Sequence, residues 1–140
     1  MGKLLSQSLA DLEELAENLL KIASEVKIIA FSGDLGAGKT TLISHIIKKL
    51  GIPEFSGSPT FSLVNEYIDP SNHPVFHFDF YRITNETEAY DIGWEDYLNS
   101  DDAWIFIEWP QRIENLLPEH FLLVDIQVVG SGRIFEWKMF

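Results

Sequence analysis

Cysteine is absent from the 140-residue chain, so disulfide bonds and thiolate metal sites are excluded. Long hydrophobic runs are also missing, because no stretch approaches the ~20 apolar residues that a membrane-spanning helix needs. The amino terminus lacks the basic and apolar pattern of a secretory leader. From these three absences we expect a cytoplasmic protein that binds no membrane.

Basic residues are scarce: 10 Lys and Arg stand against 22 Asp and Glu, which gives a net charge of −12. Proteins bind nucleic acids largely through Lys and Arg side chains that neutralise phosphates. We therefore expect that this chain does not hold RNA by itself, and that a role on tRNA would be indirect, through a partner protein. The same acidity would also suit a chain that only needs to stay soluble.

The pattern of the chain is α/β, at the size of one domain over residues 1–140. Helical periodicity contrasts with short apolar runs rich in β-branched residues, which are typical of strands. Helices are expected over 8–23, 40–50 and, broken by Gly93, 86–98; strands are expected over 26–31, 61–67, 75–81, 103–109, 121–129 and 133–138. The result is a mixed sheet with parallel core strands and antiparallel hairpins.

The most informative run lies between the first expected strand and the second expected helix. Gly33-Asp34-Leu35-Gly36-Ala37-Gly38-Lys39-Thr40 matches the phosphate-binding loop G-x-x-x-x-G-K-[ST] at every fixed position, and Thr41 follows it. The glycines let backbone N–H groups converge on phosphate oxygens, and the start of the helix adds a positive dipole end. Lys39 is expected to reach the β- and γ-phosphates, and Thr40 to ligate Mg²⁺. The sequence therefore predicts a site for a nucleoside triphosphate.

Such a loop works with acids at the ends of neighbouring strands, which anchor the metal and position the attacking water. In VFHFDFYR (75–82), the two-residue period places Asp79 with His77 and Tyr81 on one face, opposite the phenylalanines. In AWIFIEWP (103–110), the apolar run predicts a central strand that brings Glu108 beside the phosphates. Either acid could instead be a solvated strand end, and spacing does not decide which would hold Mg²⁺.

Other polar residues are weaker candidates. Thr60, in a loop before a strand, could sense the γ-phosphate as switch loops do, although a plain turn is the alternative. An arginine often completes a triphosphate transition state, with surface ion pairing as the alternative; the chain has Arg82, Arg112 and Arg133. A zinc site at His73 and His77 is discounted, because four residues along a strand separate them by ~13 Å.

Four motifs together resemble the bacterial ATPase family of tRNA threonylcarbamoyladenosine biosynthesis, called TsaE or YjeE. They are the phosphate loop at 33–41, SPTF at 58–61 followed by Leu63-Val64, HFDFYR at 77–82 and IEWP at 107–110. They stand in the family's order and spacing, and the resemblance runs from Ser8 to Arg133. This combination is far more specific than the phosphate loop alone.

The resemblance implies a small P-loop fold without the substrate lids of kinases. It implies Lys39, Asp79 and Glu108 as catalytic residues and Mg²⁺ held by Thr40 with Glu108 or Asp79. It also implies a nucleotide-responsive loop at Thr60 and Arg133 near the nucleotide; residues 33–41 would bind ATP.

The resemblance further implies ATP hydrolysis, weak without partners, by a protein docked on the TsaB–TsaD pair. In that family, TsaD transfers a threonylcarbamoyl group to an adenosine of tRNA. One departure is visible: Leu12 stands where the family usually has Thr, which puts a contact from this helix to the nucleotide base in doubt.

The phosphate loop is also compatible with three rival functions. A small-molecule kinase would need an Arg-rich lid and an acceptor pocket, for which little chain follows Thr40. A GTPase would need the guanine-recognition motif Asn-Lys-x-Asp, which the sequence lacks. A nucleotide-dependent docking module without turnover would use the same loop as an ATPase, so the sequence does not separate these two.

Overall fold

The computed structural model describes residues 1–6, 8–60 and 62–140. Its strands are β1 (Gly2–Ser6), β2 (Ile28–Gly33), β3 (Val64–Ile68), β4 (Pro74–Asp79), β5 (Trp104–Glu108), β6 (Leu122–Val129) and β7 (Gly132–Met139). Its helices are α1 (Leu9–Ile22), α2 (Lys39–Lys49), α3 (Thr87–Asp91), α4 (Trp94–Leu98) and the 3-10 helix η1 (Pro110–Leu116).

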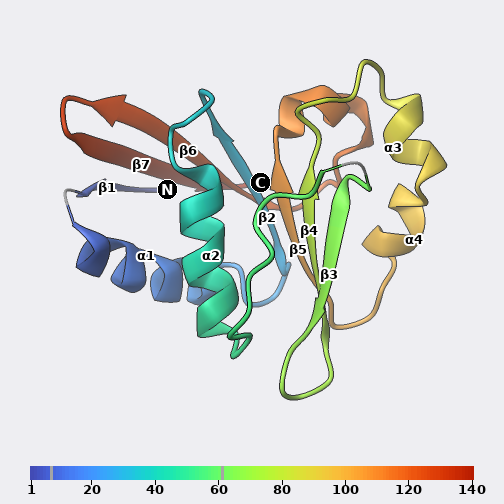
Figure 1. Ribbon diagram of the computed structural model, residues 1–140, viewed down its shortest axis with the longest axis horizontal. Helices are drawn as coiled ribbons and strands as arrows, with labels where there is room; N and C mark the ends of the chain where they lie inside the picture. Colours follow the sequence, from blue (N-terminus) through green and yellow to red (C-terminus); the bar gives the residue numbers. More distant parts are fainter. Residues whose placement is uncertain (7, 61) are drawn as a thin grey trace.

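All the described strands join one sheet of seven, in the order β1-β7-β6-β2-β5-β4-β3 (Figure 1). The four neighbouring strands β6, β2, β5 and β4 are parallel. The outer pairs β1–β7, β7–β6 and β4–β3 are antiparallel. The predicted α/β fold with parallel core strands and antiparallel hairpins is confirmed.

Helices cover both faces of the sheet (Figure 1). On one face, α1 and α2 pack their apolar sides against alternate strand residues such as Phe31 and Phe106. On the other face, α3, α4 and η1 pack against the residues between these, such as Ala30 and Ile107. Because β5 is covered on both faces, all five of its residues are buried. The central strand is therefore fixed, and Glu108 at its carboxyl end is fixed with it.

Most expected elements form, and their physical causes are visible. Ser8 caps α1, because its Oγ accepts a hydrogen bond from the backbone N–H of Asp11 at 3.4 Å. The expected helix over 86–98 is split at Gly93, whose φ of 87° ends α3 and begins α4.

Several strand boundaries differ from expectation by one or more residues, and one strand was not predicted. The strand expected over 61–67 begins at Val64, and Phe61 lies outside the described residues. Strand β1 was not predicted: five residues beside the amino terminus carry too short a pattern, and their partner β7 lies at the other end of the chain.

None of the described helices has the length and apolarity that crossing a bilayer requires.

Candidate functional site

The predicted phosphate loop connects the end of β2 to the start of α2, as its motif requires. Gly38, at the amino end of α2, has a φ of 110°, and no side chain among the described residues caps this end. Gly33 has a φ of 148°, and a Cβ there would lie 2.7 Å from the backbone oxygen of Ile126. Both positions therefore need glycine, and the first turn of α2 offers its backbone N–H groups to the cavity in front of it.

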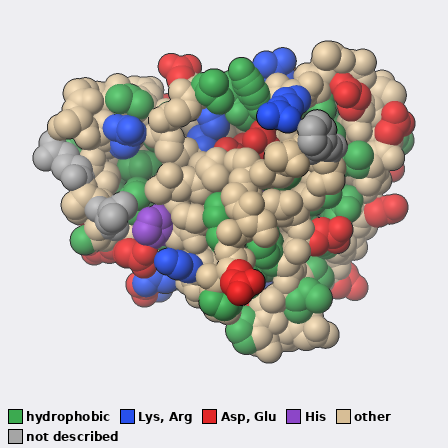
Figure 2. Space-filling view, in the orientation of Figure 1, with side chains coloured by type: hydrophobic (Ala, Val, Ile, Leu, Met, Phe, Trp, Pro, Cys, Tyr) green, Lys and Arg blue, Asp and Glu red, His purple; other side chains and the backbone are tan. Residues whose placement is uncertain are grey.

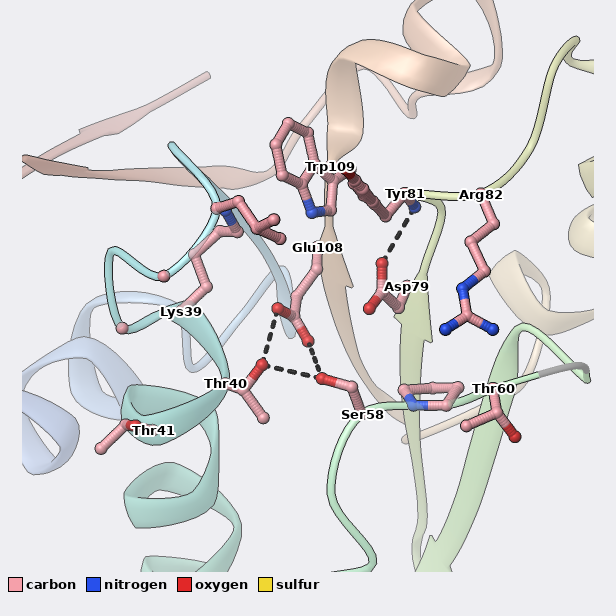
Figure 3. A pocket seen from close by; sticks show the side chains of 14 residues that line it. Lys39, Thr40, Thr41, Ser58, Thr60, Asp79, Tyr81, Arg82, Glu108 and Trp109 are labelled. Carbon is pink, nitrogen blue, oxygen red and sulfur yellow. Dashed lines mark hydrogen bonds between the residues drawn. The ribbon is translucent and has the colours of Figure 1, made fainter.

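A cavity of about 620 Å³ opens in front of this loop (Figure 3). It is lined from the phosphate loop, the segment before β3, and the carboxyl ends of β4 and β5. The lining residues are Leu35, Gly36, Gly38, Lys39, Thr40, Thr41, Ser58, Pro59, Thr60, Asp79, Tyr81, Arg82, Glu108 and Trp109. Figure 2 shows Lys and Arg side chains at the top of the molecule and others at its left and lower left.

Glu108 is the centre of a hydrogen-bond network in the cavity (Figure 3). Thr40 Oγ1 donates to Glu108 Oε1 at 2.9 Å, and Ser58 Oγ donates to Glu108 Oε2 at 3.2 Å. The two hydroxyl oxygens also lie 2.7 Å apart. Each hydroxyl has only one hydrogen, so the three contacts among Thr40, Ser58 and Glu108 share two hydrogens. The network therefore joins the phosphate loop, the segment before β3 and the end of β5 around one carboxylate.

A fully buried histidine on the neighbouring strand β4 also contacts Glu108. His77 Nε2 lies 2.7 Å from Glu108 Oε2, and the His77 side chain is 0% exposed. Sequence reasoning missed both Ser58 and His77 as site residues. Their signals were present, since Ser58 opens the SPTF motif and His77 shares its strand face with Asp79.

Asp79 stands beside Glu108 because β4 and β5 are parallel and their last residues are paired in register. Asp79 Oδ1 accepts a hydrogen bond from the backbone N–H of Tyr81 at 2.9 Å. Burial raises the pKa of Asp79, the Tyr81 hydrogen bond opposes this rise, and the nearby Glu108 charge adds to it. A carboxyl with a raised pKa is a better proton acceptor than an ordinary one.

Lys39 is folded back onto its own loop. Its Nζ donates to the backbone oxygens of Gly33 and Asp34, and it lies 4.1 Å from the ring centroid of Trp109. Burial lowers the pKa of Lys39, while the charges of Glu108, Asp79 and Asp34 counteract this shift. The ammonium group is held among groups that a phosphate could replace as its partners.

The structure places the predicted site residues in one main cavity and in two other hollows. The cavity brings together Leu35, Gly36, Gly38, Lys39, Thr40, Thr41, Thr60, Asp79 and Glu108. In contrast, Gly33, Asp34 and Ala37 line a shallow hollow against β6. Arg133 lies on β7, donates from Nε to the backbone oxygen of Ala37 at 2.9 Å, and lines a third hollow with Leu12.

The three arginines also separate. Arg82 lines the cavity, and its guanidinium faces the space beside Asp79 and Thr60 (Figure 3). Arg112 lies over the rings of Tyr81 and Trp109, at 5.8 and 6.0 Å from their centroids. Arg133 contacts the phosphate loop through its hydrogen bond to the Ala37 backbone oxygen. Of the three, Arg82 is the one placed among the cavity residues.

The oxygen atoms of the network fit a magnesium ion chemically. A hydroxyl and a carboxylate, from Thr40 and Glu108, lie together with the Asp79 carboxylate in one cavity. Within the part of the chain that the structure describes, no cluster of three or more His, Cys, Asp or Glu side chains could hold a metal. In proteins, Mg²⁺ is commonly bound through one or two carboxylates, and phosphates and water complete its shell.

Comparisons with known proteins agree with this geometry. The sequence model of the family described as "Threonylcarbamoyl adenosine biosynthesis protein TsaE" matches residues 6–134. The tRNA threonylcarbamoyladenosine biosynthesis protein TsaE of Haemophilus influenzae is 38% identical over 125 residues, covering 89% of this chain and 78% of that protein. The protein of the same name from Rickettsia bellii is 34% identical over 138 residues, covering 95% of this chain and 94% of its own.

A solved structure supports the fold separately. The crystal structure of Bacillus subtilis YdiB superposes with a TM-score of 0.74 at 24% identity, covering 97% of this chain and 83% of that one. The match to the family model spans most of the chain, and the relatives match over most of their own lengths. The chain therefore belongs to the TsaE family of threonylcarbamoyladenosine biosynthesis proteins.

Proposed function

We propose that this protein binds Mg²⁺ and ATP in the cavity and hydrolyses the ATP while it acts with TsaB and TsaD in the modification of tRNA. One observation carries the proposal: Lys39, Thr40, Asp79 and Glu108 come from three different elements and line one cavity. These are the groups that a phosphate-loop hydrolase needs, namely a phosphate-binding cation, a metal-binding hydroxyl and two acids.

The ATP phosphates would lie on the loop, with the base in the hollow beyond it. Gly38 and Thr41 line both the cavity and the hollow that contains Arg133, so the two spaces adjoin. Leu12 and Phe135 give the hollow apolar walls. Leu12 would therefore contact the base through its apolar surface, in place of the hydroxyl that the family usually has there.

Thr40 and Glu108 would hold the magnesium ion. The direct contact between their oxygens favours Glu108 over Asp79 as the protein's carboxylate ligand. When bound, Mg²⁺ neutralises charge on the β- and γ-phosphate oxygens. Ser58 would then keep one carboxylate oxygen of Glu108 in place from the opposite side.

Asp79 would orient the attacking water. Its carboxylate lines the cavity, one of its oxygens is fixed by the Tyr81 N–H, and its raised pKa suits a proton acceptor. Lys39 would leave the Gly33 and Asp34 oxygens and donate to the phosphates, stabilising the charge that develops there. Arg82, on the other side of the cavity, is placed to add a second positive charge (Figure 3).

The tRNA and its modifying enzyme would be supplied by partners. The net charge of −12 does not suit unaided binding to RNA. The curated relatives are named for tRNA threonylcarbamoyladenosine biosynthesis, which supports a place in that process for this chain. TsaB and TsaD are the partners that the family resemblance implies.

Release of inorganic phosphate from Mg-ATP tests the proposal. The purified protein should release phosphate slowly alone and faster with TsaB and TsaD, and removal of Mg²⁺ by a chelator should stop the reaction. ATP binding without phosphate release under all these conditions would contradict hydrolysis and support the docking module instead. Transfer of the phosphate to an added metabolite would support the kinase.

A further inference from the structure

We infer that His77 is a positioning residue for hydrolysis, which holds the Glu108 carboxylate toward Thr40 and Ser58. The inference rests on the proposed function and adds a residue that lies outside the cavity. Its Nε2 lies 2.7 Å from Glu108 Oε2, on the neighbouring parallel strand. His77 does not line the cavity, so it can act on the nucleotide only through Glu108.

The direction of the hydrogen bond follows from the chemistry of the two groups. In the proposed function Glu108 binds Mg²⁺ as an anion, which only accepts, so the inference assigns the hydrogen between the side chains to His77 Nε2. Glu108 Oε2 thus receives hydrogen bonds from His77 and Ser58, while Oε1 receives one from Thr40. Of these three donors, His77 is 0% exposed and stands on a strand, whereas Ser58 comes from a loop.

Because Glu108 is buried, the orientation of its carboxylate depends on the contact with His77. Glu108 is 2% exposed, so a lost hydrogen bond at Oε2 is not replaced by bulk water. The carboxylate would then turn toward other donors, such as the Lys39 ammonium group, with which its charge interacts. An acid turned in this way would no longer present its oxygens beside the Thr40 hydroxyl. His77 therefore fixes the orientation on which the cavity depends.

The ring of His77 is itself held in place by packing. Phe55 stacks on it with the ring centroids 5.8 Å apart and the planes at 22°. Tyr67 also stacks on Phe55, with the ring centroids 6.3 Å apart, and its hydroxyl accepts a hydrogen bond from the Ser56 backbone N–H. This stack connects the buried histidine to the segment that carries Ser58. His77 thus supports two of the contacts around Glu108, one directly and one through this segment.

The test compares His77→Leu with His77→Gln. Leucine removes the donor, whereas the glutamine amide can place an N–H near the former Nε2 position. We expect His77→Leu to lower kcat for Mg-ATP roughly 100-fold in the presence of TsaB and TsaD, the size of effect that a misplaced catalytic group produces. KM for ATP should change little, whereas the thermal midpoint should fall by roughly 5 °C because the buried carboxylate loses a donor. His77→Gln should restore most of kcat and most of the thermal midpoint. The matched control is His120→Leu, at an exposed histidine, which should behave as the unmodified protein.

Two results would overturn the inference: normal kcat in His77→Leu, or equally low kcat in His77→Gln and His77→Leu when both are folded. If His77→Leu does not fold, His77→Asn replaces it, because the shorter amide stays polar but cannot reach Glu108. If the unmodified protein releases no phosphate under any condition, the proposed function fails, and crystal structures decide about His77. Displacement of the Glu108 carboxylate from Thr40 and Ser58 in the variant would still support its positioning role, and an unmoved carboxylate would overturn it.

Discussion

Thr40 Oγ1 and Glu108 Oε1 lie 2.9 Å apart, although 68 positions separate the two residues in the chain. The first is the second residue of α2, after the phosphate loop, and the second is the last residue of the parallel strand β5. The fold thus places the hydroxyl of the loop motif directly on a buried carboxylate. The proposed function uses this contact to favour Glu108 as the acid that would share Mg²⁺ with Thr40, which leaves Asp79 for the water.

Replacing Lys39 should remove ATP binding. The Lys39→Ala variant loses the cation that the loop would present to the β- and γ-phosphates. Loss of one partner in a buried, charged hydrogen bond costs about 2 kcal/mol or more, so affinity should fall at least ~30-fold. Isothermal titration calorimetry with Mg-ATP measures the change, and Lys48→Ala, at an exposed position of the same helix, is the control. Unchanged affinity in Lys39→Ala would refute the site assignment.

Replacing either acid should separate binding from turnover. Glu108→Gln and Asp79→Asn preserve the size of the side chain but remove its charge, so ATP should still bind within a few-fold of normal affinity. Hydrolysis should fall roughly 100-fold or more, because a general base or an electrostatic stabiliser typically contributes that much. Phosphate release under saturating Mg-ATP measures the effect, with the exposed Glu119→Gln as the control. Normal turnover in both acid variants would contradict the roles proposed for Glu108 and Asp79.

Asp79 should lower the stability of the protein at neutral pH. Burial raises its pKa above the usual 3.8, so the folded state holds this proton more tightly than the unfolded chain. The free energy of unfolding therefore falls as pH rises from about the usual value through the raised pKa. Asn at this position cannot ionise, and its oxygen can still accept the Tyr81 N–H.

In metal-free buffer at pH 7, Asp79→Asn should accordingly melt at a higher temperature than the unmodified protein. The difference should shrink as the pH is lowered and vanish below the usual carboxyl pKa, where both proteins are uncharged at this position. Asp101→Asn, at an exposed turn, is the control. A variant that melts at or below the temperature of the unmodified protein at pH 7 would contradict a raised pKa at Asp79.

Gly33→Ala should destabilise the protein by forcing the phosphate loop against strand β6. The new Cβ would approach the Ile126 backbone oxygen to 2.7 Å, at a φ that favours glycine. Strain of this kind costs of order 1–3 kcal/mol, which corresponds to a drop in thermal midpoint of roughly 5 °C. Gly130→Ala, in a hairpin turn with open space around it, should cost less. An equal midpoint for Gly33→Ala and the unmodified protein would show that β6 yields at this point.

The phosphate loop and the two strand-end acids could be predicted because each depends on local order. The loop motif is contiguous, and a two-residue period fixes the face on which Asp79 lies. The order of the strands in the sheet could not be predicted, because it depends on contacts between residues that are far apart in the sequence. That β5 lies between β2 and β4, with Glu108 opposite Thr40, follows from packing on both faces of the sheet.

The contacts of Ser58 and His77 were beyond sequence reasoning for the same reason. Ser58 meets Glu108 across 50 positions and His77 meets it across 31, so no spacing rule connects them. The spacing of His73 and His77 argues against a shared metal, but it does not indicate that His77 has an acid partner on the next strand. Strand β1 was missed because its pairing with β7 joins the two ends of the chain.

Reconstitution with TsaB and TsaD tests the central claim most directly, that ATP turnover in this cavity drives a tRNA modification. Threonylcarbamoyladenosine is measured in tRNA after repeated reaction cycles with the unmodified protein, with Lys39→Ala, with Glu108→Gln and without this protein. The account predicts sustained modification only with the unmodified protein and with the Lys48→Ala control. Equal modification with Lys39→Ala and Glu108→Gln would contradict it.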